Sequence, residues 1–88
     1  MYTYAVRESL EKDLRTLAKK NPEQLRRIGK KIEEITSSED AHRYKNLKRP
    51  LNHLKRVHID SSFVLVFSVH DTHIIFEALD HHDTIYKS

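Results

Sequence analysis

The sequence has no cysteine and no tryptophan, and it contains a single glycine and two prolines. Without cysteine, the chain can form neither disulfides nor thiolate metal sites. No apolar run is long enough to span a bilayer, and the first residues, "MYTYAVRESLEKD", lack the apolar stretch of a signal peptide. We therefore expect a cytoplasmic protein. Its 88 residues suffice for one core, so residues 1–88 are predicted to form a single domain.

The net charge is only +3, but it is unevenly distributed along the chain. Residues 42–58, "HRYKNLKRPLNHLKRVH", contain six Lys and Arg and no acidic residue, whereas residues 59–88 contain one Lys and five acidic residues. A basic block of this kind is the electrostatic footprint of a protein that binds phosphates or an acidic partner. A solvated, lysine-rich loop is the alternative, and composition does not choose between the two.

The first half of the chain predicts a strand followed by two helices. "YTYAV" (Tyr2–Val6) is rich in aromatic and β-branched residues, which is typical of a strand. Apolar residues then recur at helical spacing, at positions 10, 14 and 17 and again at 25, 28, 32 and 35. Between the two stripes, "KKNPEQ" offers Asn21 as a cap, Pro22 for the first helical position and Gln24 to complete a capping box. Residues 8–36 should form a helical hairpin.

The only glycine, Gly29, lies inside the second predicted helix, where it costs about 1 kcal/mol relative to alanine. Close approach of the first helix is the simplest explanation for it. The same helix has four cations, at positions 26, 27, 30 and 31. Such a run is usually a solvated face, and a contact with an acidic partner segment is the alternative.

After Arg43 the apolar period becomes two, which is typical of strands. In "HLKRVHI", Val57 and Ile59 share one side with Lys55, while Arg56 and His58 share the other. "SFVLVFSV" (residues 62–69) is apolar on both sides and predicts a central strand, which "HDTH" connects to a last strand, "HIIFEALDH". The predicted fold is α+β, in the order β-α-α-β-β-β, with the helical hairpin on one face of a small, mostly antiparallel sheet. The helices should cover Val57 and Ile59, leaving Arg56 and His58 on the other face.

The C-terminal segment "LDHHDTIYKS" contains two adjacent histidines, His81 and His82. Neighbours in a strand point to opposite faces, so both could chelate one ion only at a bend. The spacing matches no zinc motif, and His70 and His73 beside the turn could bind a metal only adventitiously. We therefore predict no metal site and no cofactor. A solvated polar end and a set of proton-transfer groups remain as alternatives.

Metal-free RNA cleavage would suit such proton-transfer groups. It needs a base for the 2′-hydroxyl, an acid for the leaving 5′-oxygen and cations beside the phosphorane. The side chains of Arg56, His58, His82 and Tyr86 would supply all of these if the strands that contain residues 56–58 and 80–82 meet across the sheet.

"LKRPLNHLKRVHI", "FVLVFSV" and "HHDTIYK" resemble, in order and over almost the whole chain, the RelE/ParE superfamily of toxin–antitoxin toxins. Ribosome-dependent mRNA endonucleases are the most similar members, particularly the YafQ-like branch. The resemblance implies that His58 and His82 are the acid/base pair and that Tyr86 orients the nucleotide or the reacting hydroxyl. It implies that Arg56 holds phosphate, and it extends RNA contact to a further set of residues: Lys45, Lys48, Arg49, Lys55 and Phe63.

The resemblance also implies partners, namely a cognate RelB-like antitoxin, the ribosome and mRNA. By the same likeness His82, rather than His81, is the functional histidine, with Asp80 or Asp83 placed to orient its imidazole. The sequence departs from the family pattern at Val64, where many RelE-type members have arginine, and at Ser62 and Phe63, where the YafQ-like branch has an acidic residue and tryptophan. A ParE-like toxin that binds gyrase and a non-catalytic regulatory module of the same fold are the alternatives.

Overall fold

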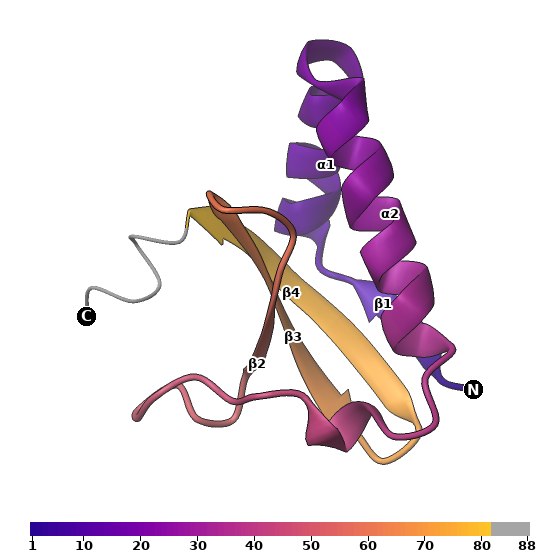
Figure 1. Cartoon of the computed structure of the whole chain (residues 1–88), viewed down its shortest axis with the longest axis vertical. Helices are drawn as coiled ribbons and strands as arrows, with labels where there is room; N and C mark the ends of the chain where they lie inside the picture. Colours follow the sequence, from indigo (N-terminus) through magenta and orange to yellow (C-terminus); the bar gives the residue numbers. More distant parts are fainter. Residues whose placement is uncertain (82–88) are drawn as a thin grey trace.

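The computed structural model describes residues 1–81, so the predictions for His82 and Tyr86 lie outside the described residues. Figure 1 shows the element order, which confirms the predicted β-α-α-β-β-β arrangement and adds one short 3₁₀ helix. The elements are β1 (Thr3–Val6), α1 (Glu8–Lys20), α2 (Pro22–Thr36), η1 (Ala41–Arg43), β2 (Lys55–His58), β3 (Phe63–His70) and β4 (His73–His81).

The break between the two helices follows the predicted capping pattern. Asn21 Oδ1 accepts a hydrogen bond from the backbone N–H of Gln24 at 3.2 Å, and Pro22 occupies the first position of α2. The Asn21 side chain thus satisfies one of the amides that a helix start leaves without a partner. No helix within residues 1–81 has the length and apolarity needed to cross a bilayer.

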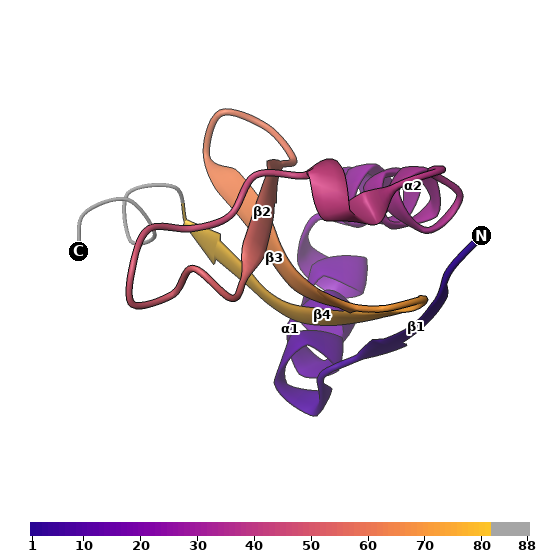
Figure 2. The ribbon, with the colours of Figure 1, turned by 90° about the horizontal axis from the view of Figure 1, so that it is seen from below.

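The four strands form one sheet in the order β1-β4-β3-β2, with β1 parallel to β4 and the other two pairs antiparallel. Figure 2 shows β1 beside β4, at the edge of the sheet away from β2. The register of β3 and β4 shifts between Val66 and Phe67, so that Glu77 is the extra residue of a bulge on β4. The bulge exchanges the two faces of β4, with the result that Phe76 and Leu79 both face the helices.

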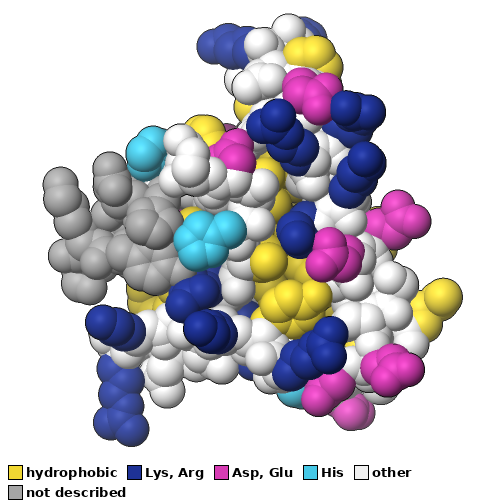
Figure 3. Space-filling view, viewed as in Figure 1, with side chains coloured by type: hydrophobic (Ala, Val, Ile, Leu, Met, Phe, Trp, Pro, Cys, Tyr) yellow, Lys and Arg dark blue, Asp and Glu magenta, His cyan; other side chains and the backbone are white. Residues whose placement is uncertain are grey.

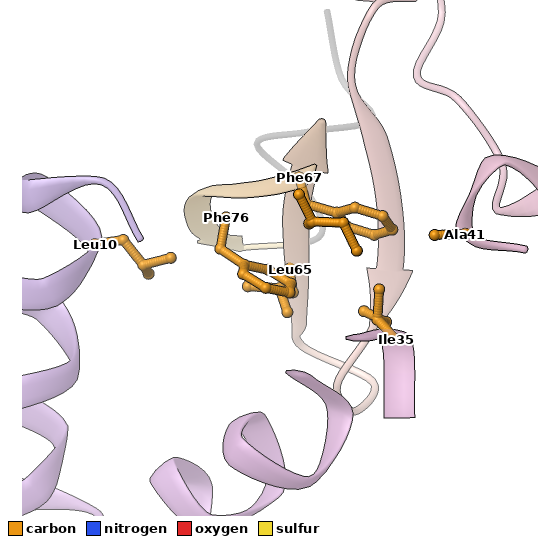
Figure 4. Packing of buried hydrophobic residues seen from close by; sticks show 7 residues of the cluster. Leu10, Ile35, Ala41, Leu65, Phe67 and Phe76 are labelled. Atoms are coloured by element: carbon orange, nitrogen blue, oxygen red, sulfur yellow. The ribbon is translucent and has the colours of Figure 1, made fainter. Parts of the chain in front are cut away.

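The main core lies between the helices and one face of the sheet. In Figure 4, Leu10 of α1, Ile35 of α2 and Ala41 of η1 surround residues of β3 and β4. The buried strand residues of this cluster are Leu65, Phe67, Ile74 and Phe76. Val57 and Ile59 pack against the same cluster. The prediction that the helices cover these two residues is confirmed, and Arg56 and His58 consequently lie on the opposite face, which we call the open face.

The open face has a small apolar cluster of its own, formed by Val64 and Val66 of β3 with Leu47 and with the partly buried Leu54 and Ala78. Leu47 reaches it from the segment before β2, which also pairs with the outer edge of that strand. Leu47 N donates to Leu54 O at 2.9 Å, and Arg56 N donates to Lys45 O at 3.0 Å. The central strand is therefore covered on both faces, as its sequence predicts, by the helices and by this segment.

In α2, the structure contradicts the expectation for Gly29 and gives one of the nearby cations an acidic neighbour. A Cβ added at Gly29 would meet nothing within 4 Å, so the expected close approach of α1 is wrong. The cations nearby are largely on a solvated face, but Arg27 lies 3.7 Å from Asp60 in the β2–β3 connection. The Ser62 amide, which donates to Asp60, is the main cause that lowers the pKa of that carboxyl, and the amide of Phe63 and the charge of Arg27 add to it. This contact joins α2 to the sheet.

Candidate functional site

A hollow of about 510 Å³ lies beside β2 and contains the predicted residues Arg56 and His58. Its other lining residues are Arg43, Tyr44, Lys45 and Val57. We call it the β2 hollow. It forms where the chain leaving η1 runs alongside β2, and the bond from Arg56 N to Lys45 O fixes the two segments together. Three cations and an imidazole thus border one concave surface.

The hollow includes two residues that the sequence-based assignment missed, Arg43 and Tyr44. The edge of the Tyr44 ring packs on Phe67, with ring centroids 5.6 Å apart, so the phenol is held by the main core. Both residues belong to the basic block of residues 42–58, and that charge pattern could have found them. Figure 3 shows Lys and Arg side chains gathered over the lower part of β2 and the segment that precedes it, apart from a second group along α2.

The strand register places His58 in line with two residues across the open face. His58 is opposite Val64 of β3, and Val64 is opposite Asp80 of β4. Directly opposite residues of a sheet point to the same face. His58 and Asp80 therefore lie on the same face of the sheet, on two strands that are separated by β3.

Lys55 has a structural position that does not suit its predicted contact with RNA. The residue is only 8% exposed, and its ammonium donates to His42 O at 2.8 Å, Tyr44 O at 2.9 Å and Asn46 Oδ1 at 3.1 Å. A buried ammonium is stable when its protons are satisfied in this way. Lys55 faces the main core side of β2 and holds the chain that borders the hollow. Its ammonium is thus occupied within the fold, and its contact with RNA stays a prediction.

Phe63 and His81 also lie away from the β2 hollow. They are opposite one another at the ends of β3 and β4, with ring centroids 5.5 Å apart in an edge-to-face arrangement. This pair is on the helix side, where Phe63 lines a separate apolar groove of about 240 Å³ with Leu17 and Leu79. The structure does not bring Phe63 together with His58, and it separates His81 from His58 by placing them on opposite faces.

Lys48 and Arg49 are exposed in the segment between η1 and β2. This segment folds back through bonds from Leu51 N to Lys48 O at 2.9 Å and from Asn46 Nδ2 to Asn52 O at 2.8 Å. Its two cations do not line the β2 hollow, whereas Lys45 does. Contacts from such exposed cations to phosphates supply affinity and salt dependence, not selectivity.

The other end of the open face, near the β3–β4 turn, contains four polar side chains that are hydrogen-bonded in a row. Arg7 Nε donates to Glu77 Oε1 at 2.7 Å, Ser68 Oγ donates to Glu77 Oε2 at 2.8 Å, and His70 Nε2 lies 2.9 Å from Ser68 Oγ. Because the Ser68 proton is directed to the carboxylate, Ser68 Oγ must accept from His70 Nε2–H. Nε2 of His70 therefore has a proton in this arrangement.

Burial raises the pKa of Glu77, but the hydrogen bonds from Arg7 and Ser68, with the charges of Arg7 and His70, outweigh it and leave the pKa below its usual value. Glu77 is thus held as a carboxylate by its neighbours. Within residues 1–81, no group of three or more His, Asp or Glu side chains could hold a metal ion, and this includes the surroundings of His70 and His73.

Comparisons with known proteins give two relatives over nearly the full length. The chain is 52% identical over 89 residues to "Putative toxin RelE4" from Methanocaldococcus jannaschii, covering 99% of this chain and 93% of the relative. It is also 52% identical over 88 residues to an uncharacterized protein from Methanosarcina mazei, covering 98% of this chain and 100% of that protein. No protein-family model matches the chain.

Solved structures share the fold at lower identity. The YoeB–YefM complex from Staphylococcus aureus includes a chain with a TM-score of 0.76 and 18% identity, covering 93% of this chain and 98% of that one. YafQ from E. coli has a TM-score of 0.66 and 13% identity, covering 98% of this chain and 99% of that one. Identities this low show the fold alone. They do not single out the YafQ-like branch, because the match to the YoeB–YefM complex has the higher TM-score.

Proposed function

Because this chain belongs to the RelE family of toxins, we propose that it is a ribosome-dependent mRNA endonuclease that inhibits translation and is neutralised by a cognate antitoxin. The β2 hollow is the observation that carries the proposal. An imidazole, His58, lies there with three cations at the edge of a sheet face that the helices leave uncovered. Such a surface suits a phosphodiester, which needs positive charge and a group that transfers protons near neutral pH.

In the proposed reaction the 2′-oxygen of the mRNA attacks the adjacent phosphorus, and the bond to the 5′-oxygen breaks. One group removes the 2′-hydroxyl proton and another protonates the leaving oxygen. The family resemblance assigns this work to His58 and His82, with Tyr86 orienting the reacting nucleotide. Arg56 stabilises the charge on the phosphorane, and Lys45 and Arg43 hold neighbouring phosphates. The exposed Lys48 and Arg49 add long-range attraction to RNA.

The proposed antitoxin follows from the family and from the solved relatives. YoeB with YefM from Staphylococcus aureus and YafQ with DinJ from E. coli have both been crystallised as toxin–antitoxin complexes. We expect a partner segment that covers part of the open face and neutralises the cations of the basic block with acidic side chains. Co-expression with the product of an adjacent gene, followed by co-purification, tests for this complex.

The activity is tested on ribosomes programmed with a defined mRNA. We expect cleavage that leaves a 2′,3′-cyclic or 3′-phosphate and a 5′-hydroxyl, since no water or metal enters the first step. The same cleavage should persist in EDTA when ribosome integrity is maintained with a non-chelated polyamine. Intact mRNA with the purified protein, under conditions where a known RelE-type endonuclease cleaves, would contradict the proposal.

A second candidate function is favoured by one observation, the burial of Val64. Its side chain is fully buried in the apolar cluster of the open face, where many RelE-type members have an arginine. A member without that cation could bind the ribosome or the antitoxin and lack the chemistry. This non-catalytic module would bind programmed ribosomes and leave the mRNA intact, so the cleavage assay separates it from the endonuclease.

A further inference from the structure

We propose that Tyr44 is the base-stacking residue of the β2 hollow, and that its ring stacks on a base of the bound mRNA while the cations beside it hold phosphates of the same strand. The inference rests on the proposed endonuclease function and deepens it, because it says how the hollow holds a nucleotide. The observation behind it is that, among the described residues, Tyr44 contributes the only phenyl or phenol ring to the lining of the hollow.

Tyr44 lies between two cations in the segment that borders the hollow. Arg43 and Lys45 are exposed and Tyr44 is half-buried, and all three line the hollow together with Arg56 of β2. Single-stranded nucleic acids bind where cations follow the phosphates and an aromatic ring stacks on a base. The volume of about 510 Å³ is that of a typical small-ligand site, so the hollow can take one nucleotide.

The ring of Tyr44 is held in place from the core side. Its centroid lies 5.6 Å from that of the buried Phe67, and the two ring planes meet at 78°. In an edge-to-face pair of this kind, at least one face of the Tyr44 ring is not covered by Phe67. The stacked base takes the side of the ring that is turned to the hollow.

The backbone of Tyr44 is fixed as well as its ring. Its carbonyl accepts a hydrogen bond from Lys55 Nζ at 2.9 Å, and its amide donates to Ala41 O at 3.4 Å. The next residue is tied to β2 by the bond from Arg56 N to Lys45 O at 3.0 Å. A side chain that is already ordered loses little conformational entropy when a ligand binds, so stacking on Tyr44 contributes fully to affinity.

Two other aromatic residues do not meet these conditions. Phe63 lies on the helix side of the sheet, where it lines the separate apolar groove. Tyr4 of β1 makes the same kind of core contact as Tyr44, because its ring centroid is 5.6 Å from that of Phe76 and the planes meet at 78°. However, Tyr4 does not line the hollow, and β1 and β2 are at opposite edges of the sheet. Tyr4 is therefore a matched control, with a similar core contact and no hollow beside it.

The first experiment compares Tyr44→Leu with Tyr4→Leu in single-turnover cleavage on programmed ribosomes. Tyr44→Leu should raise the protein concentration that gives the half-maximal rate by roughly 5–150-fold, the usual contribution of a base stacked on an aromatic side chain. The maximal rate should fall much less, because stacking holds the substrate and the transition state alike. Tyr4→Leu should leave both quantities unchanged, and Tyr44→Phe, which keeps a ring, should retain the affinity. Thermal melting verifies that each variant is folded.

The second experiment removes the base instead of the ring, with abasic nucleotides placed one at a time across the mRNA codon in the decoding site. At one position, the abasic nucleotide should weaken binding of the unaltered protein as much as Tyr44→Leu does, and should weaken binding of Tyr44→Leu no further, because ring and base form one contact. Independent losses at every position, or equal half-maximal concentrations for Tyr44→Leu and Tyr4→Leu, overturn the assignment and leave the endonuclease function standing. If the unaltered protein leaves the mRNA intact, the endonuclease function fails, and the same comparison of ribosome-binding constants still decides whether Tyr44 stacks on a base.

Discussion

The two ends of the open face contain the same kinds of side chain in different arrangements. Near the β3–β4 turn, His70, Ser68, Glu77 and Arg7 form a continuous chain of hydrogen bonds. Near the start of β3, Arg56 and His58 border the β2 hollow, and Asp80 lies across Val64 from the imidazole. The members of the first group are hydrogen-bonded to one another, whereas Arg56 and His58 of the second border a hollow that Asp80 does not line.

The two ends therefore differ in whether a hollow lies beside the polar side chains. A buried or half-buried polar atom costs free energy unless it is paired, so the hydrogen-bonded row around Glu77 is explained by the fold alone. A hollow bordered by three cations and an imidazole is a surface that suits a phosphodiester. The hairpin end ties β1 and the start of α1 to β4, and we assign the chemistry to the end that contains His58.

The sharpest way to break this comparison is to remove one histidine from each end. His58→Ala should slow single-turnover cleavage on programmed ribosomes by roughly 10²–10⁴-fold, because it removes a proton-transfer group. His82→Ala should have an effect of similar size, and His70→Ala and His81→Ala should change the rate little. Equal rates for His58→Ala and His70→Ala would show that the two ends do not differ in function.

Neutralising cations tests whether the ribosome and its mRNA bind at the basic block or along α2. Neutralising Lys45, Lys48 and Arg49 together should weaken ribosome binding and reduce the slope of log affinity against log salt by about 2, since each phosphate contact with a single strand contributes about 0.7. Neutralising Arg26, Lys30 and Lys31 on α2 is the matched control and should leave the slope nearly unchanged. A reversed result would place the RNA on the helices.

Lys55 and Lys48 test whether a buried and an exposed cation of the basic block differ in their contribution to stability. Lys55→Met should lower the free energy of unfolding by about 2–3 kcal/mol, because it leaves the carbonyls of His42 and Tyr44 without their charged donor. Lys48→Met, in an exposed position, should change it by less than about 0.5 kcal/mol. Urea denaturation measures both, and an unchanged stability for Lys55→Met would restore Lys55 as a candidate for RNA contact.

The case of Lys55 also shows what the sequence could predict and what it could not. Periodicity predicted the element order, the helix break at Asn21 and the face of Val57, because each depends on residues near one another in the chain. The fate of the Lys55 ammonium depends on carbonyls of η1, which arrive there through the tertiary fold. The β4 bulge at Glu77 likewise has no local signature, yet it decides that Asp80 shares a face with His58.

For the functional residues, too, the sequence predicted what depends on residues near one another in the chain and missed what depends on the tertiary fold. Charge density indicated the basic block and therefore the neighbourhood of the β2 hollow, but it did not separate Lys45, which lines the hollow, from Lys55, which is buried. The assignments of His58 and Arg56 stay predictions about activity, made more specific by their shared position. Those of His82 and Tyr86 lie outside the described residues.

The hydrogen bonds to Glu77 near the β3–β4 turn predict a pH dependence of stability. The pKa of Glu77 is lower in the folded protein than in the unfolded chain, so the folded state binds fewer protons there. This stabilisation is complete above the unfolded-state pKa and is lost as the pH falls through the folded-state pKa. Glu77→Gln should cost about 1 kcal/mol at pH 7 and lose less stability than the unaltered protein on acidification. Urea denaturation at several pH values measures this, and parallel pH curves would contradict it.

The smallest expected effect concerns Gly29, at a site where the structure gives glycine no task. A Cβ there would meet nothing within 4 Å, and the residue is exposed in the interior of α2. Gly29→Ala should therefore raise the free energy of unfolding by about 0.5–1 kcal/mol, through the higher helix propensity of alanine, and leave cleavage unchanged. Calorimetry or urea denaturation measures the gain, with Ala18→Gly in α1 as the reverse control. A stabilised variant that loses affinity for the antitoxin would show that this part of α2 is a docking surface, and a destabilised one would mean that α2 packs more closely at Gly29 than the open space around it indicates.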